Sequence, residues 1–162
     1  MGAEGTKTLR GERIILATGS RIRSWPSLEV DGRRVFTSDE ALKRSTLPRS
    51  VVIIGGGAVG VEFAYLYSVF GVVVMIVESA PTLLPSEDRE VSALLQRSFE
   101  KRGITVLTST HIDAIKDHGS HFMIQFTKTE EEIRTDAILV AIGRTPNVDG
   151  LDLKKAGISI SE

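Results

Sequence analysis

The sequence predicts an α/β fold in which helices flank a parallel β-sheet and a three-stranded antiparallel meander precedes the last strand. Two observations carry this prediction. Short, continuous apolar runs alternate with helical stretches, and such runs are typical of parallel strands covered on both faces. Later in the chain, three segments alternate apolar and polar residues, as antiparallel strands with one solvent-facing side do.

The strands are expected in the following order. One apolar run at residues 13–17 is expected to be a buried strand. Four further runs are expected to form the parallel sheet: residues 50–54, 72–77, 104–107 and 137–141. The meander is expected to be the crossover before the last of these, with strands at residues 111–116, 121–127 and 132–135 and turns at residues 117–120 and 128–130.

Helices are expected between these strands. Thr37 and Glu40 have the spacing of a capping box, which predicts a short helix. A longer helix ends at Gly71, and another is expected to be capped by Ser86 and to end before Gly103. The apolar face of this last helix is expected to consist of Val91, Leu94, Leu95, Ser98 and Phe99.

Composition limits the classes of function. The 162 residues are 41% hydrophobic and 25% charged, as in an ordinary globular domain. A net charge of −1 argues against nucleic acid or a membrane surface as the main partner. The sequence has no cysteine, so these residues offer no thiol chemistry and no Cys-based zinc site. Neither a signal-peptide h-region nor an apolar run long enough to span a bilayer is visible, so a cytoplasmic location is expected.

The strongest site signal is a glycine motif, Gly55-x-Gly57-x-x-Gly60, that directly follows the run at residues 50–54 and opens a helix. Gly55 permits the tight turn, Gly57 lets the backbone approach a pyrophosphate, and Gly60 lets the helix pack close to the sheet. Glu78 ends the next strand, where a carboxylate accepts hydrogen bonds from the adenosine ribose. This is the context of a Rossmann dinucleotide site. Because a carboxylate repels a 2′-phosphate, NAD is favoured over NADP.

Glu62 and the three histidines are the other candidate site residues. Glu62 lies in the first turn of the same helix, where it is either a partner of the helix dipole or a contact to the nicotinamide end of the cofactor. His111, His118 and His121 fit no metal-ligand spacing, and the last two flank a glycine-containing turn, so no metal site is expected. No catalytic residue is assigned.

Five segments together resemble the flavin-dependent pyridine nucleotide–disulfide oxidoreductases. The principal one is Val-Val-Ile-Ile-Gly-Gly-Gly-Ala-Val-Gly-Val-Glu-Phe-Ala at residues 51–64. The others lie at residues 15–20, 37–42, 83–92 and 141–147. Within the family, this combination is most similar to the dihydrolipoyl dehydrogenase branch. The resemblance covers nearly the whole chain.

The resemblance implies roles for particular residues. Glu78 would bind the adenosine ribose, Glu62 would lie near the nicotinamide, and Ile112 would pack on the adenine. The NAD pyrophosphate would meet Gly55, Gly56, Gly57, Ala58, Val59 and Gly60. Thr18, Gly19 and Ser20 would lie at the edge of the FAD site. The segment beside the nicotinamide and flavin would be Ala141, Ile142, Gly143 and Arg144. The alternative for Arg144, which is the less favoured one, is a hinge or surface arginine.

The family's FAD glycine motif, its Cys-x₄-Cys redox pair and its His-Glu acid/base pair are absent from this sequence. The resemblance therefore predicts an NAD-binding domain at residues 21–143. Residues 1–20 would be the remnant of a crossing from an FAD domain, and residues 144–162 would begin the return into it.

The resemblance also implies a function. The parent enzyme would oxidise protein-bound dihydrolipoamide through its disulfide and FAD and pass hydride to NAD⁺. Its partners would be the lipoyl-bearing proteins of 2-oxo-acid dehydrogenase complexes, and it would be a homodimer. This chain would bind NAD, would need the parent for FAD, and is expected to be inactive alone. Two alternatives are a stand-alone NAD(H)-binding or sensing module without catalysis and the NAD domain of another member of the superfamily.

Overall fold

The computed structural model describes residues 8–25, 28–127 and 132–160. The chain divides into two compact units, one of residues 22–144 and a smaller one of residues 1–21 and 145–162. The predicted turn at residues 128–130 lies outside the described residues. Among the residues that are described, no helix has the length and apolar character needed to cross a membrane.

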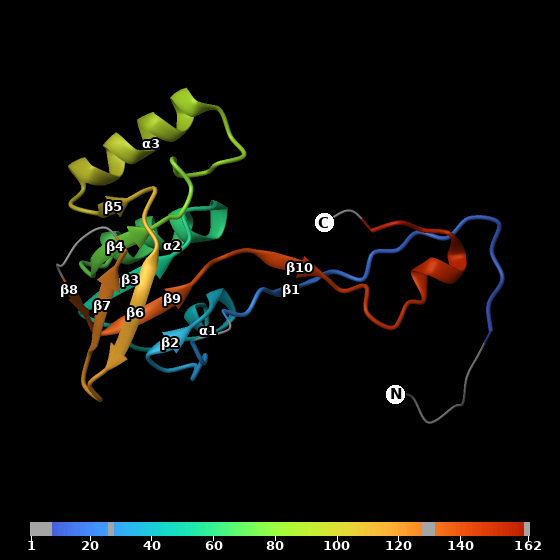
Figure 1. Ribbon diagram of the computed structural model, residues 1–162, viewed down its shortest axis with the longest axis horizontal. Coiled ribbons are helices and arrows are strands. Elements are labelled where there is room, and N and C mark those ends of the chain that lie inside the picture. Colours follow the sequence, from blue (N-terminus) through green and yellow to red (C-terminus); the bar gives the residue numbers. More distant parts are fainter. Residues whose placement is uncertain (1–7, 26–27, 128–131, 161–162) are drawn as a thin grey trace. The chain divides into compact units, whose positions relative to one another are not determined.

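A five-stranded parallel sheet forms the centre of the larger unit, with the strand order β2-β9-β3-β4-β5 (Figure 1). The four predicted parallel strands are confirmed. A fifth, which the sequence analysis did not assign, is the two-residue edge strand β2. The bounds are β2 (Val35–Phe36), β3 (Ser50–Ile54), β4 (Val73–Val77), β5 (Thr105–Leu107) and β9 (Ala137–Val140).

The short helix α1 (Ser38–Ala41) begins at the predicted capping box. The Thr37 N–H donates to the Glu40 carboxylate at 2.9 Å, and the Asp39 N–H donates to the Thr37 hydroxyl at 3.3 Å. These hydrogen bonds satisfy N–H groups that a helix start leaves without partners. The longer helix α2 (Ala58–Val69) ends before Gly71, as predicted.

Helix α3 (Arg89–Lys101) corrects two expectations. Its N-cap is Asp88, not Ser86, because the Asp88 carboxylate accepts the Glu90 N–H at 2.8 Å. Its buried face also differs, since Val91 and Leu94 are 54% and 64% exposed. The buried positions are Ser92 and Phe99, with Leu95 partly buried between them. A serine can be buried there because its hydroxyl donates to the Asp88 carbonyl at 3.1 Å.

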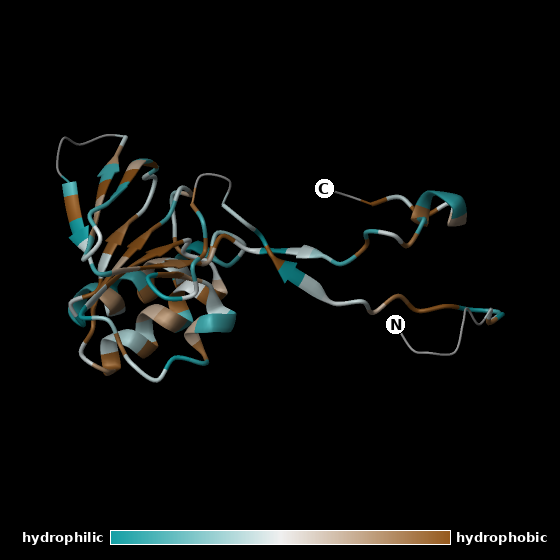
Figure 2. Ribbon diagram, turned by 90° about the horizontal axis from the view of Figure 1, so that it is seen from below, coloured by the Kyte–Doolittle hydropathy of each residue, from teal (hydrophilic) through white to brown (hydrophobic). Residues whose placement is uncertain are grey.

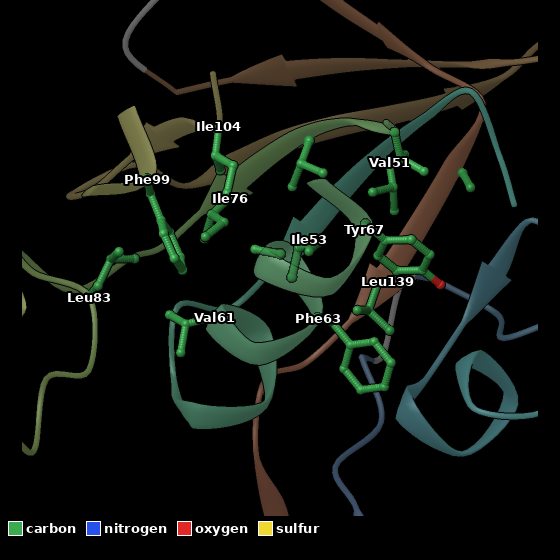
Figure 3. Packing of buried hydrophobic residues seen from close by; sticks show 14 of the residues in the cluster. Val51, Ile53, Val61, Phe63, Tyr67, Ile76, Leu83, Phe99, Ile104 and Leu139 are labelled. Atoms are coloured by element: carbon green, nitrogen blue, oxygen red, sulfur yellow. The ribbon is translucent and has the colours of Figure 1, made fainter. Parts of the chain in front are cut away.

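The helices and the meander cover opposite faces of the sheet (Figure 2). On the helical face, Ile53 and Leu139 of the sheet pack with Phe63 and Tyr67 of α2 and Phe99 of α3 (Figure 3). These side chains point to one side of their strands, whereas their neighbours along each strand point to the other. The alternation gives every central strand two buried faces, which explains the continuous apolar runs.

The predicted meander is confirmed as a three-stranded antiparallel sheet of β6 (Ile112–Asp117), β7 (Phe122–Phe126) and β8 (Glu132–Thr135). Alternate residues of β7 are buried against the parallel sheet. This second core includes Phe122, Ile124, Phe126, Val52, Ile54, Ile138 and Val140.

The smaller unit contains the 3₁₀ helix η1 (Leu153–Ala156) and most of the short strand pair β1 (Ser20–Ile22) and β10 (Arg144–Pro146), of which Ile22 and Arg144 belong to the larger unit. The strand expected at residues 13–17 is not formed, and Ile14 and Ile15 are 76% and 90% exposed. A continuous apolar run becomes a buried strand only where neighbouring strands cover it, and no described strand pairs with this one.

Candidate functional site

A cavity of about 640 Å³ opens where β3, β4 and β9 end, entirely within the larger unit. In open parallel sheets, ligands bind in crevices at the carboxyl ends of the strands. The described residues that line it are Trp25, Ile54, Gly55, Gly57, Ala58, Val59, Val77, Glu78, Ser79, Pro85, Thr110, His111, Ile112, Ala141, Ile142 and Gly143.

In the turn between β3 and α2, each glycine of the motif can be explained by what a Cβ at that position would meet. Gly55 has φ +109°, and a Cβ there would overlap the Ala141 carbonyl group. A Cβ at Gly60 would overlap the Gly55 carbonyl oxygen, so this glycine permits the close approach of helix and turn. A Cβ at Gly57 would meet no atom within 4 Å, because this glycine borders the cavity. At Gly57 the backbone of the turn is therefore open to a ligand in the cavity.

The same turn leads into the N-terminus of α2. Gly57 is the N-cap and provides no side-chain hydrogen bond. The first i−4 bond of the helix runs from the Val61 N–H to the Gly57 carbonyl at 3.0 Å. The N–H groups of Ala58 and Val59, which both line the cavity, have no such partner within the helix. Backbone N–H groups and the positive end of the helix dipole suit a phosphate group.

Glu78 is bound directly to this turn. Its Oε2 accepts the Gly56 N–H at 2.6 Å, and its Oε1 accepts the Ala80 N–H at 2.7 Å. The Ser79 hydroxyl also donates to Oε1, at 3.1 Å. A Cβ at Gly56 would lie 2.7 Å from Leu83 Cδ2 and 3.1 Å from the Glu78 Cβ, so a larger residue there would press on both side chains. The carboxylate is thus held at the cavity wall with part of its acceptor capacity in use.

Two loops after β4 and β5 complete this side of the cavity. The Thr110 N–H donates to the Glu78 carbonyl at 3.0 Å, and the Ser109 N–H donates to the Ala80 carbonyl at 2.8 Å. These bonds bring Thr110 and His111 beside Glu78. Sequence reasoning did not assign either residue to the site. Their position just after a parallel strand was the available signal.

The predicted residues divide by position. Those that line the cavity are Gly55, Gly57, Ala58, Val59, Glu78, Ile112, Ala141, Ile142 and Gly143. Gly56 and Gly60 support the turn from behind. Glu62 is exposed and lines a separate hollow between α2 and α3, with Tyr65 and Arg102. Arg144 is exposed at the start of β10.

Thr18, Gly19 and Ser20 belong to the smaller unit. There the Thr18 hydroxyl donates to the Asn147 carbonyl at 2.6 Å, and the Asn147 N–H donates to the Gly19 carbonyl at 3.0 Å. Within this unit, the two chain segments are therefore joined by hydrogen bonds as well as by the β1–β10 pair.

The histidines are not gathered into one group. His111 lines the cavity, whereas His118 and His121 flank the β6–β7 turn with stacked rings whose centroids are 5.1 Å apart. Within the described ranges, no group of three or more His, Cys, Asp or Glu side chains is arranged to hold a metal ion.

The fold and the cavity together define a domain of the Rossmann type, the class found in FAD- and NAD-dependent oxidoreductases. A family model described as pyridine nucleotide-disulphide oxidoreductase matches residues 2–162. The chain belongs to this family. Its members are flavoproteins that use a pyridine nucleotide.

Two of the relatives are named dihydrolipoyl dehydrogenase, and a third is a solved structure. A dihydrolipoyl dehydrogenase of Mycobacterium leprae is 41% identical over 91% of this chain and 32% of its own length. That of Chlorobaculum parvum is 43% identical over 94% of this chain and 33% of its own. The crystal structure of LpdA from Mycobacterium tuberculosis superposes with a TM-score of 0.77 at 30% identity, covering 90% of this chain and 31% of that one. The chain spans about a third of the length of the relatives it matches.

Proposed function

We propose that this chain is the NAD(H)-binding domain of a dihydrolipoyl dehydrogenase. The observation that carries the proposal is the hydrogen bond between the Gly56 N–H and the Glu78 carboxylate at the wall of the cavity. This bond places a carboxylate next to the glycine turn. A dinucleotide needs this pairing, because its pyrophosphate and its adenosine ribose are neighbours.

The residues present fit NAD. The pyrophosphate would lie over Gly57, where the backbone is uncovered, and near the N–H groups that open α2. The adenosine ribose hydroxyls would donate to the remaining acceptor capacity of Glu78. When bound, NAD⁺ supplies the ring that accepts hydride. The apolar walls of the cavity, such as Ile112 and Ile142, would exclude water from the flat rings at its two ends.

The relatives' name supports a wider proposal for the whole enzyme. Dihydrolipoyl dehydrogenation converts a dithiol to a disulfide, and the two electrons and a proton leave as hydride to NAD⁺ while a second proton is released. The dithiol would belong to lipoyl-bearing proteins of 2-oxo-acid dehydrogenase complexes. We further propose that residues 1–20 and 144–162 belong to the FAD domain, and that the enzyme is a cytoplasmic homodimer.

The test is a calorimetric titration with NAD⁺ and with NADP⁺. A 2′-phosphate beside Glu78 would be repelled, and like charges in contact cost enough to give at least about a tenfold preference for NAD⁺. The informative variant is Glu78→Gln, read as the ratio of the two affinities. A glutamine has one carbonyl oxygen and cannot accept both the Gly56 and Ala80 N–H groups as the carboxylate does, so the turn loosens for both cofactors alike. The ratio changes because glutamine carries no charge to repel a 2′-phosphate and accepts the ribose hydroxyls of NAD⁺ less well than the carboxylate does.

The matched control is Glu100→Gln on the exposed surface of α3, which removes the same charge away from the cavity. We expect this variant to keep the ratio of the parent, while Glu78→Gln moves the ratio toward one. Equal affinity of the parent for NAD⁺ and NADP⁺ would contradict the role of Glu78. Failure of the parent to bind either cofactor would contradict the proposed function.

A further inference from the structure

The single tryptophan of the chain, Trp25, lies in the wall of the dinucleotide cavity, and the proposed pyrophosphate and ribose contacts do not use it. It is partly buried and packs at the edge of the core between the sheet and the meander. Its carbonyl accepts the Leu28 N–H at 3.3 Å. A large aromatic ring that is anchored on one side and borders a cavity on the other is a surface for a flat ligand group.

The strand order shows which half of a dinucleotide would reach this ring. The glycine turn follows β3, the central strand; Glu78 follows β4 on one side of it, and Gly143 follows β9 on the other. With the pyrophosphate at the turn and the adenosine ribose at Glu78, the nicotinamide half must extend toward β9. The segment that carries Trp25 is tied to that side, because the Arg23 N–H donates to the Gly143 carbonyl at 3.0 Å.

We propose that the indole of Trp25 binds the nicotinamide ring and that it favours the oxidised cofactor. The inference rests on the proposed NAD function. The nicotinamide of NAD⁺ is a cation, and the indole face is the strongest aromatic partner for a cation. The ring of NADH is neutral and gains only the apolar contact. Trp25 is therefore a residue that determines redox-state preference as well as a binding residue.

The experiment compares NAD⁺ with ADP-ribose, which has the same adenosine, pyrophosphate and ribose but lacks nicotinamide. Calorimetry measures the binding of both ligands without reference to tryptophan. Trp25 emission, excited where adenine does not absorb, reports the nicotinamide alone, because a pyridinium ring quenches an indole only in contact. We expect NAD⁺ to quench this emission and ADP-ribose to bind without quenching it.

Variants give the second readout. Trp25→Ala should weaken NAD⁺ binding by about 2- to 30-fold, the range of a cation–π contact, and should leave ADP-ribose binding unchanged. Trp25→Phe should restore part of the NAD⁺ affinity. Phe70→Ala, which removes a 61% exposed aromatic ring at the end of α2, serves as the control and should change neither affinity.

The outcomes separate this inference from the function on which it rests. If NAD⁺ binds but ADP-ribose quenches Trp25 equally, the ring faces the adenosine half and the inference is wrong. Equal losses for the two ligands in Trp25→Ala would likewise refute a nicotinamide contact. If neither ligand binds the parent by calorimetry, the proposed function itself fails, and this inference fails with it.

Discussion

Two glycines of the same turn should respond in opposite ways to the smallest possible substitution. Gly57 and Gly60 lie three residues apart, and alanine adds one methyl group at either position. At Gly60 the added Cβ would overlap the Gly55 carbonyl oxygen and lie 3.0 Å from its carbonyl carbon. Because these are backbone atoms in a tight turn, helix and strand must move apart. At Gly57 the added Cβ would meet nothing within 4 Å.

The magnitudes follow from this geometry. Overpacking a close backbone contact lowers the free energy of unfolding by about 3 kcal/mol. Replacing glycine by alanine inside a helix raises it by about 1 kcal/mol. Gly60→Ala should therefore lower the free energy of unfolding by about 2 kcal/mol, which in a domain of this size lowers Tm by about 4–8 °C. Gly57 is the N-cap, where alanine is disfavoured, so Gly57→Ala should cost no more than about 1 kcal/mol.

For cofactor binding we expect the reverse order, with Gly57→Ala losing more NADH affinity than Gly60→Ala. The methyl group of Gly57→Ala occupies the side of the turn that faces the cavity, where the pyrophosphate would approach the backbone. We expect NADH binding to weaken at least about tenfold, since a lost phosphate contact to backbone N–H groups is a charge-assisted hydrogen bond of about 1.5–3 kcal/mol. Thermal unfolding by circular dichroism and an NADH titration below the Tm of each variant measure both effects. If both variants fold and bind like the parent, the reasoning is refuted.

Two further predictions concern stability. Hydrogen bonds from the Thr37 hydroxyl and backbone N–H hold the pKa of Glu40 below its ordinary value of 4.5. Its carboxylate therefore stabilises the fold fully above that pH, and this contribution is lost as the pH falls through the lowered pKa. Glutamine can still form the capping box, so Glu40→Gln removes only the charge and should cost less than about 1 kcal/mol near neutral pH in chemical denaturation. This deficit should shrink on acidification, and a constant deficit would contradict the reasoning. Ile15→Ser, at a side chain that is 90% exposed, should change the free energy of unfolding by less than about 0.5 kcal/mol, whereas Ile53→Ala in the core should cost about 2–5 kcal/mol. An Ile15→Ser variant that unfolds as readily as Ile53→Ala would show that residues 13–17 are packed after all.

The parts of the fold that the sequence predicted are those determined by local chemistry. A strand covered on both faces must be apolar throughout, so β3, β4 and β9 could be located from composition alone. The glycine turn could be located because each of its positions has a separate steric demand. The capping box at Thr37 involves residues only three positions apart. In each case a short segment of the sequence contains the residues that determine the local structure.

The expectations that were wrong depend on partners elsewhere in the chain. The helix α3 turns Ser92 rather than Val91 and Leu94 toward the core, because a hydroxyl that bonds to its own backbone can be buried without loss. The predicted start of α3 was wrong because Ser86 and Asp88 have similar N-cap propensities, and the helix begins at Asp88. Residues 13–17 have the composition of a buried strand but no described strand beside them.

The cavity shows the same division. The role of Glu78 as a ribose ligand could be proposed from its place after a strand. Its hydrogen bond with the Gly56 N–H, which joins the carboxylate to the glycine turn, could not be predicted. Trp25 gave no signal, since it precedes the sheet in sequence and lies at the cavity through tertiary contacts, which include its packing on the core and the hydrogen bond from the Arg23 N–H to the Gly143 carbonyl. The glycine motif therefore specifies the centre of the site, where the chemistry is common to many dinucleotides. Under the proposed function, the residues that would distinguish one cofactor from another, Glu78 and Trp25, lie at its two ends.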